Sequence, residues 1–280
     1  MKAAFAKGIW SVQIKQPQLQ IARNYTPLPP APSLKTNSGD DNETGKKGSD
    51  DQIHLLIRRE QSGEVSNYLH DLPSNSTIHL RGPFDELPVS LESTKSIIFL
   101  AGGTGIAPAL QVAGLVAQSG RKDVKVTILW ANRRREECAG GGDGAQSRGG
   151  WMSWFRSSSS AGSDLREKTE EKGEIVKLVR TLQDQTSPGQ LSVDYFVDEE
   201  GSFIKPGELS KLSTSHTSKS RELDNQSQEN SSGLIMISGP DGFMEYWAGR
   251  KEWVGGREVQ GRLGGVLGKM NLKDWKVAKI

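Results

Sequence analysis

A glycine-rich stretch follows a short apolar run near the middle of the chain. Residues 97–101 are apolar, residues 102–105 read Gly-Gly-Thr-Gly, and an apolar-periodic segment starts at Ile106. Glycine lets a ligand approach the main chain, and the positive end of a following helix binds anions, most often phosphate. The stretch predicts either a phosphate-binding corner of a nucleotide-binding α/β domain or a tight strand-to-helix turn without a ligand.

A second group with binding chemistry stands at residues 23–26, which read Arg-Asn-Tyr-Thr. These residues leave the end of an alternating strand and enter a proline-rich coil. The fork of Arg23 suits a phosphate, the ring of Tyr25 suits stacking on a flat heterocycle, and Thr26 suits a hydrogen bond to that heterocycle. The alternative is an ordinary strand end with a packed tyrosine.

Two further turns have residue types that suit a ligand. Residues 63–66, Gly-Glu-Val-Ser, open a helix where a hydroxyl meets free backbone amides, and the alternative is a capped helix that binds nothing. Residues 238–243, Ser-Gly-Pro-Asp-Gly-Phe, form another strand-to-turn corner, which on its own is only a turn.

Together, the order and spacing of these four elements resemble the ferredoxin–NADP reductase superfamily, and its cytochrome-b5-reductase-like branch most closely. The resemblance covers residues 9–280 apart from three low-complexity insertions. It implies an antiparallel FAD-binding β-barrel followed by a parallel-sheet NAD(P)-binding α/β domain. Residues 21–30 and 267–275 look more narrowly like fungal mitochondrial flavoproteins that act in cytochrome c import and haem attachment.

The resemblance implies a role for each matching position. It implies that flavin is held by Arg23, Tyr25 and Thr26, and its pyrophosphate by Gly63, Val65 and Ser66. It implies that the pyridine nucleotide, NADH or NADPH, binds at Gly102, Gly103, Thr104, Gly105 and Pro108, with Ser238, Gly239, Pro240 and Phe243 beside the nicotinamide. Tyr25 and Thr26 would lie nearest the hydride transfer, so they must face the corner at Thr104.

Three features depart from the superfamily pattern. The chain begins too late to contain the opening strands of the barrel, which predicts an incomplete barrel with exposed edges. Membrane association, if it occurs, is expected through a segment missing before Met1. Ser238 stands where the family usually has cysteine. The aromatic residue that often ends such chains is not terminal here. Trp275 is the nearest candidate, although a core tryptophan is the better interpretation.

Two polar segments bear on specificity and partners. Residues 132–137, Asn-Arg-Arg-Arg-Glu-Glu, offer arginines for the 2′-phosphate of NADPH. The adjacent acidic residues weaken that preference and favour a solvated turn. Both NADH and NADPH therefore stay candidates for the nucleotide. Trp151, Trp154 and Phe155, in a Gly/Ser-rich stretch, either dock a partner or membrane surface or, more commonly, fold back on their own domain.

Composition excludes several classes of function. The 280 residues suit two domains, and 36 basic against 34 acidic residues give a net charge of only +2, which argues against nucleic acid as a partner. One cysteine excludes an internal disulfide, and four scattered histidines suggest no metal site. No run of about twenty apolar residues is present. The first eight residues are no convincing targeting segment, so a mitochondrial location rests on the resemblance alone.

The elements that must position these residues fall into two halves. Residues 1–92 predict mainly β-structure, with strands at 9–15, 19–25, 53–59 and 77–80, one short helix, and a disordered loop over 33–51. Residues 93–280 alternate strands with helices and contain low-complexity insertions at 139–163 and 213–232. The strands are expected at 97–101, 124–130, 191–197, 234–237 and 275–280. This alternation predicts a parallel sheet that binds ligands at the carboxyl ends of its strands.

The predicted activity is that of a flavin-dependent NAD(P)H reductase. The resemblance implies hydride transfer from nicotinamide to flavin and single electrons onward to an acceptor, with haem or cytochrome c as the acceptor in the narrower group. No general acid is needed, so the lack of a catalytic histidine does not count against it. The rivals are a non-catalytic flavin- or nucleotide-binding assembly factor or sensor, and a nucleotide-dependent dehydrogenase without flavin.

Overall fold

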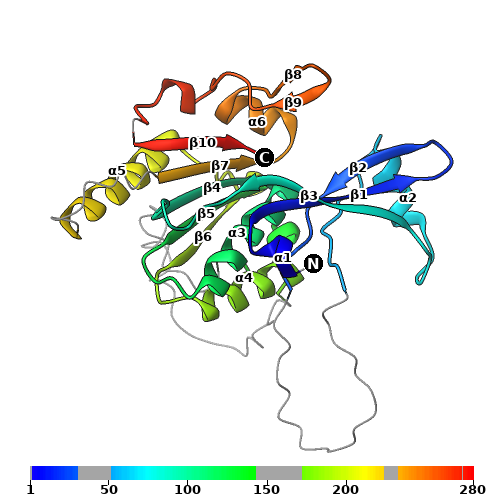
Figure 1. The fold of residues 1–280 in the computed structure, drawn as a ribbon, viewed down its shortest axis with the longest axis horizontal. Helices are drawn as coiled ribbons and strands as arrows, with labels where there is room; N and C mark the ends of the chain where they lie inside the picture. Colours follow the sequence, from blue (N-terminus) through cyan, green and yellow to red (C-terminus); the bar gives the residue numbers. More distant parts are fainter. Residues whose placement is uncertain (1, 31–51, 143–171, 224–232, 273) are drawn as a thin grey trace, which may run out of the picture.

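The computed structural model describes residues 2–30, 52–142, 172–223, 233–272 and 274–280. Within these ranges, an antiparallel three-stranded sheet lies beside a parallel five-stranded sheet (Figure 1). The predicted fold class is therefore confirmed. The loop expected over 33–51 and the aromatic residues at 151–155 lie outside the described residues. None of the helices in the described ranges is long and apolar enough to cross a bilayer.

The antiparallel sheet has the strand order β2-β1-β3. Its strands are β1 (Gly8–Gln16), β2 (Ile21–Tyr25) and β3 (His79–Pro88), with the short helix α1 (Lys2–Phe5) before β1 and α2 (Glu64–Asp71) before β3. The period-2 alternation of β1 buries Trp10, Val12 and Ile14 on one face, whereas β3 is exposed along almost its whole length. Within the described residues, β2 and β3 are the two edges of this sheet.

The parallel sheet has the order β10-β7-β4-β5-β6. Its strands are β4 (Ser96–Gly102), β5 (Lys125–Asn132), β6 (Leu191–Val197), β7 (Gly233–Ser238) and β10 (Trp275–Lys279). Every residue of β4 is buried because helices cover both of its faces. Ile97 and Phe99 belong to the core on one face, and Ile98 and Leu100 to the core on the other.

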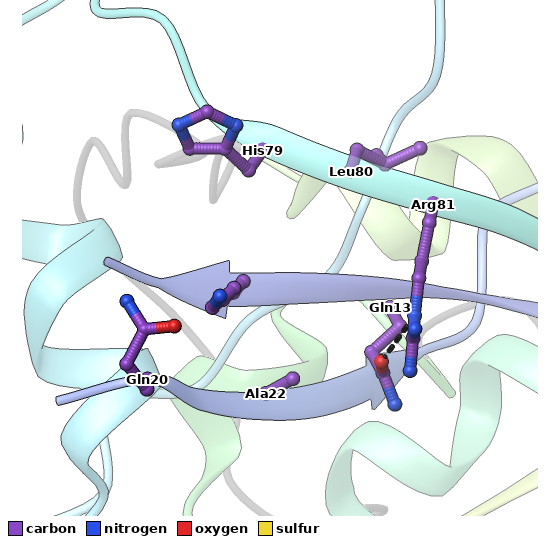
Figure 2. Close-up of a pocket in the computed structure, with 7 residues that line it drawn as sticks. Gln13, Gln20, Ala22, His79, Leu80 and Arg81 are labelled. Atoms are coloured by element: carbon purple, nitrogen blue, oxygen red, sulfur yellow. Dashed lines mark hydrogen bonds between the residues drawn. The ribbon is translucent and has the colours of Figure 1, made fainter.

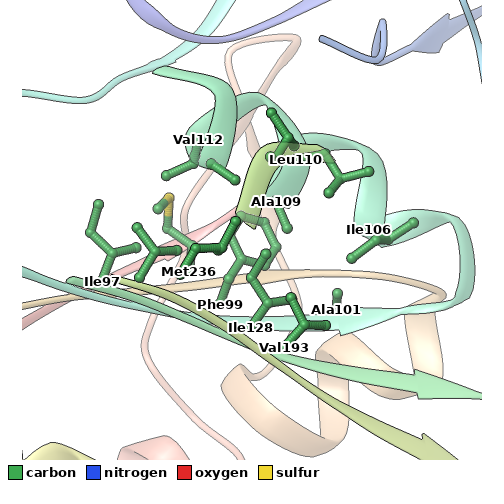
Figure 3. Close-up of a cluster of buried hydrophobic side chains, with 14 of the residues drawn as sticks. Ile97, Phe99, Ala101, Ile106, Ala109, Leu110, Val112, Ile128, Val193 and Met236 are labelled. Atoms are coloured by element: carbon green, nitrogen blue, oxygen red, sulfur yellow. The ribbon is translucent and has the colours of Figure 1, made fainter. Parts of the chain in front are cut away.

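Helices complete the three layers of this half. The helices α3 (Ile106–Ser119) and α4 (Glu174–Gln185) cover one face, and α5 (Pro206–Leu223) and α6 (Asp241–Ala248) cover the other (Figure 1). In Figure 3, side chains of α3 such as Leu110 meet Phe99 of β4 and Ile128 of β5 in the first of these cores. This packing fixes the carboxyl end of β4 against the start of α3.

Three predicted elements differ from the structure. The strand expected at 53–59 is wrong, because only an isolated bridge joins Leu55 to Pro27, and a proline cannot extend a ladder of hydrogen bonds. The loop expected over 213–232 is wrong up to residue 223, where α5 ends. That stretch contains neither glycine nor proline to stop a helix. The strand expected at 77–80 instead starts at His79 and runs to Pro88.

A hairpin after α6 was not expected from the sequence. It consists of β8 (Glu252–Val254) and β9 (Arg257–Val259), each only three residues long. Gly255 and Gly256 both have positive φ in the turn, as a two-residue hairpin turn requires. Strands this short carry no readable alternation, which explains the omission.

The buried Gln111 of α3 joins the two sheets. Its side chain accepts a hydrogen bond from the backbone N–H of Trp10 (2.9 Å) and donates to the backbone carbonyls of Trp10 (3.1 Å) and Pro27 (2.8 Å). One turn further along, Gly114 leaves room for Pro29, since a Cβ there would lie 2.9 Å from that ring. The coil that follows β2 is thereby fixed along α3.

Candidate active site

The turns at 102–105 and 238–243, together called the glycine corner below, lie against each other at the carboxyl ends of β4 and β7. The two strands are neighbours, and Ala101 pairs with Ser238. A Cβ on Gly102 would lie 3.0 Å from the Phe243 ring, and one on Gly105 would lie 2.2 Å from the Ser238 carbonyl. The structure therefore brings both predicted nucleotide-binding turns into one place, and the contact between them requires these two glycines.

Gly103 has a different reason to be glycine. Its φ is +53°, in the left-handed region, and its carbonyl accepts a hydrogen bond from Trp130 Nε1 at 2.9 Å. A Cβ there would lie 3.4 Å from Arg58 Nη1, so a guanidinium from the other half of the chain covers this turn. Thr104 is half-buried beside it, and Pro108 is buried in the first turn of α3, where proline is tolerated.

A buried acceptor without a partner lies near the glycine corner. The side-chain oxygen Oδ1 of Asn132, at the carboxyl end of β5, has no hydrogen-bond partner among the described residues. Buried polar atoms are nearly always paired, so an orphaned acceptor at this edge is a place where a ligand donor would fit. With the cation of Arg58 over Gly103, the corner fits an anionic nucleotide.

The residues at 23–26 and the turn at 63–66, together called the tyrosine ledge, lie on one face of the antiparallel sheet. Arg23 pairs with Ile14 and Tyr25 with Val12, so their side chains share the face of the buried β1 residues. The Tyr25 ring packs against the Trp10–Val12 cluster, and burial raises the pKa of its hydroxyl, an effect that the charge of Arg23 partly opposes. The aromatic residue is thus positioned, while part of it stays accessible.

Arg23 is an exposed member of the ledge, and its Nη1 donates to the neighbouring Ala22 carbonyl at 3.2 Å. Its side chain is 57% exposed, and its nearest carboxylate is Glu64 at 3.5 Å, in the first turn of α2. This pairing brings the strand end and the turn at 63–66 together. An exposed guanidinium with so weak a partner is available to a phosphate, which fits the predicted flavin pyrophosphate.

The Ser66 hydroxyl is engaged within its own turn, although it does not cap α2. It donates to the Gly63 carbonyl (3.1 Å) and accepts from the Glu60 N–H (3.2 Å), and Val65 beside Ser66 is buried. A Cβ on Gly63 would lie 2.5 Å from that hydroxyl, so glycine is needed for the turn itself. The hydroxyl already serves its own turn, and the fit to a flavin pyrophosphate rests on Arg23 and the turn's backbone.

A hollow of about 340 Å³ lies on the opposite face of the antiparallel sheet (Figure 2). It is lined by Gln13, Lys15, Gln20, Ala22, His79, Leu80 and Arg81. Because Gln13 and Lys15 alternate with Val12 and Ile14 along β1, the hollow faces away from Tyr25. None of the predicted site residues lines it.

Two residues that the sequence analysis considered for a ligand site have structural roles. The Arg135 guanidinium forms a two-pronged ion pair with Glu200 and donates to the Gly141 carbonyl at 2.9 Å, so its charge is already compensated. Trp275 stands at the amino end of β10, away from the strand ends that form the corner, and its ring fills the space beside Gly233. The interpretation of Trp275 as a core residue is confirmed.

Sequence reasoning missed three residues that shape the site. Trp130 holds the Gly103 carbonyl, Arg58 covers that turn, and Gln111 fixes the coil after Tyr25. Trp130 and Gln111 carry a usable signal, since each places a polar group in an otherwise apolar strand or helix. Arg58 carries none, because an arginine in a loop is ordinary.

Comparisons with known proteins agree with this arrangement. A family model described as "Oxidoreductase NAD-binding domain" matches residues 99–139, which include the turn at 102–105 and Trp130. The resemblance to the ferredoxin–NADP reductase superfamily is confirmed. The predicted cofactors, FAD and a pyridine nucleotide, agree with it as well, while the roles of individual site residues stay predictions.

Three curated relatives give the extent of the likeness. The cytochrome c mitochondrial import factor CYC2 of Saccharomyces cerevisiae is 37% identical over 34% of this chain and 27% of its own length. NADH-cytochrome b5 reductase 2 of Kluyveromyces lactis is 24% identical over 93% of this chain and 67% of its own length. An FAD-binding protein of Schizosaccharomyces pombe is 34% identical over 38% of this chain and 33% of its own length. Two of these matches thus span only about a third or less of the relative.

Proposed function

We propose that this chain is a flavin-dependent NAD(P)H oxidoreductase, with the pyridine nucleotide at the glycine corner and FAD at the tyrosine ledge. The main support for this proposal is that hydrogen bonds of Gln111 connect the two halves of the chain that hold these sites. Gln111 binds the carbonyl of Pro27, two residues after Tyr25, and lies seven residues along the chain from Thr104, or about 10 Å at the rise of a helix. The corner and the coil that follows the ledge therefore both contact the amino-terminal half of α3.

The residues of the chain bind and orient, and the flavin, when bound, supplies the hydride and single-electron chemistry. The Tyr25 ring would cover one face of the flavin ring system, with Thr26 at its edge. Arg23 would neutralise the pyrophosphate of the flavin. The turn at 102–105 would receive the nucleotide pyrophosphate, and Ser238 and Phe243 would border the nicotinamide. Such positioning brings reactants to contact distance, which is the main requirement of hydride transfer.

Anaerobic reduction of the purified full chain tests this function. The protein is reconstituted with FAD and titrated with NADH and, separately, NADPH while flavin absorbance is followed. We expect bleaching of the flavin absorbance. We expect Tyr25→Ala to lose flavin and keep nucleotide binding, and Gly103→Val to keep flavin and lose reduction. A colourless protein that FAD cannot reconstitute would contradict the proposal.

A non-catalytic assembly factor is the second candidate. It is favoured by the likeness to the yeast protein named as a cytochrome c import factor, and by Ser238 in place of the usual cysteine. This candidate predicts flavin or nucleotide binding without bleaching. A flavin-free dehydrogenase, the third candidate, predicts nucleotide binding that survives Tyr25→Ala and no flavin at all.

The acceptor and location belong to the narrower proposal. The names of the relatives suggest cytochrome b5 or cytochrome c as the acceptor and mitochondria as the compartment. The resemblance of residues 21–30 and 267–275 adds haem as a third acceptor. Mixing the reduced protein with oxidised cytochrome c, cytochrome b5 or ferric haem separates these acceptors, since only the true one is reduced at a rate that depends on the flavin. Fractionation of cells that express the whole protein tests the location.

A further inference from the structure

Arg58 reaches from the loop before α2 to the glycine corner. Distances from a Cβ built on Gly103 to Nη1, Cζ and Nη2 of Arg58 are 3.4, 3.6 and 3.7 Å. Three nearly equal distances mean that the flat face of the guanidinium lies over this glycine. A positive charge is therefore already seated on the turn to which the nucleotide pyrophosphate is assigned above.

The charge of Arg58 is paired with Glu137. The two side chains form an ion pair, and each is only 26% exposed. The other carboxylate oxygen of Glu137 accepts the backbone N–H of Arg133 at 3.2 Å. Glu137 follows β5, whose end lies next to β4 in the sheet, so a held carboxylate stands beside the corner.

We propose that Glu137 is an internal competitor for the nucleotide phosphates and sets the affinity of the glycine corner. The inference rests on the proposed function. Guanidinium groups form the same two-pronged bonds with carboxylate and with phosphate. A dinucleotide that binds the corner must take Arg58 from Glu137 or share it, and the free energy of that ion pair is subtracted from binding. Glu137 is a positioning residue in this scheme, since it acts on the ligand through Arg58.

Direct binding of NADH to the full chain, measured by calorimetry and by nucleotide fluorescence, tests the proposal. Glu137→Gln keeps the shape of the side chain and an oxygen for the Arg133 N–H while removing the charge. From the strength of partly exposed ion pairs, we expect its Kd for NADH to fall about threefold to tenfold. The matched control is Glu136→Gln, which makes the same charge change at an exposed neighbouring position. We expect its Kd to stay within about twofold of the unmodified chain.

A double-mutant cycle separates competition from general electrostatics. Arg58→Gln should weaken NADH binding, and Glu137→Gln should give no further gain in the Arg58→Gln background. Equal gains from Glu136→Gln and Glu137→Gln, or a gain from Glu137→Gln that persists without Arg58, would overturn the proposal.

The outcomes also distinguish this inference from the proposed function. If the unmodified chain binds NADH and Glu137→Gln binds it no more tightly, only the inference fails. If neither the unmodified chain nor any variant binds NADH or NADPH, both fail. The unfolding midpoint of each variant is also measured without ligand. Glu137→Gln should lower the midpoint or leave it unchanged, so that tighter binding cannot come from a more stable fold.

Discussion

The glycine corner and the tyrosine ledge are both built on glycine-bearing turns before a helix, but different contacts hold them. In the corner, Gly102 faces the Phe243 ring and Gly105 faces the Ser238 backbone of the second turn. Both turns follow buried parallel strands. In the ledge, Gly63 faces the Ser66 hydroxyl and the Cβ of the exposed Glu60, and Arg23 sits on an exposed edge strand. The same sequence signal therefore produces a rigid site in one half of the molecule and a more adaptable one in the other.

This difference has a physical cause. A strand that is buried on both faces cannot shift without moving two cores, so turns at its end inherit that rigidity. An edge strand has fewer neighbours to constrain it. We infer that substitutions at Gly102 and Gly105, which face the second turn, act mainly on folding, whereas substitutions in the ledge act mainly on ligand affinity.

The largest effect is expected from Gly105→Ala. Its new Cβ would meet the Ser238 carbonyl at 2.2 Å. Gly105 is buried in the turn before α3 and Ser238 ends β7, so the packing of α3 and the parallel sheet keeps the two from moving apart. We expect a loss of about 3 kcal/mol of unfolding free energy, measured by urea denaturation. Gly242→Ala is the control, because nothing lies within 4 Å of its Cβ. Equal stability of the two variants would refute the rigid corner.

Gln111→Leu should come next, with a loss of about 2–3 kcal/mol. The substitution leaves the backbone N–H of Trp10 and the backbone carbonyls of Trp10 and Pro27 buried without this partner. We expect limited proteolysis to cut near residue 30 sooner than in the unmodified chain, because the coil loses its attachment to α3. Gln18→Leu, at an exposed position, is the control and should leave both stability and cleavage unchanged.

Gly63→Ala should cost less, about 1 kcal/mol, because the closer clash falls on a hydroxyl that can rotate away and give up its hydrogen bonds. The second clash, with Glu60 Cβ at 2.9 Å, falls on an exposed residue of the loop before α2. The same substitution made in a Ser66→Ala background should cost less still, since the clashing oxygen is gone. Denaturation of all four proteins measures this coupling. If the cost is the same in both backgrounds, the Ser66 contact does not explain Gly63.

Arg23→Gln should have the smallest effect on stability, within about 0.5 kcal/mol, since its ion pair is exposed and long. If the ledge binds FAD, the affinity for FAD should fall about tenfold, because a charge-assisted phosphate contact is lost. Quenching of flavin fluorescence measures that affinity. Arg81→Gln, on the opposite face of the same sheet, is the matched control and should bind FAD as the unmodified chain does.

Local patterns were sufficient for most of the fold. The apolar run of β4, the helical periodicity of α3 and α4 and the alternation of β1 each predicted the element that the structure contains. The errors fell where the local composition misleads. The stretch at 53–59 is apolar enough for a strand but bridges only to a proline, and α5 extends through polar residues that look like a loop.

The sequence by itself determined the residue types and order of the candidate binding turns, because glycine, proline and hydroxyl residues at fixed spacing shape a turn locally. Only the tertiary structure decided which turns touch each other and which charges they share. It placed the turn at 238–243 against 102–105, turned the Ser66 hydroxyl back onto its own turn, and brought Arg58 and Glu137 to Gly103. Apart from the local contact of Ser66, those partners are far apart in the chain, and contacts of that kind depend on how the sheets pack, which no local spacing encodes.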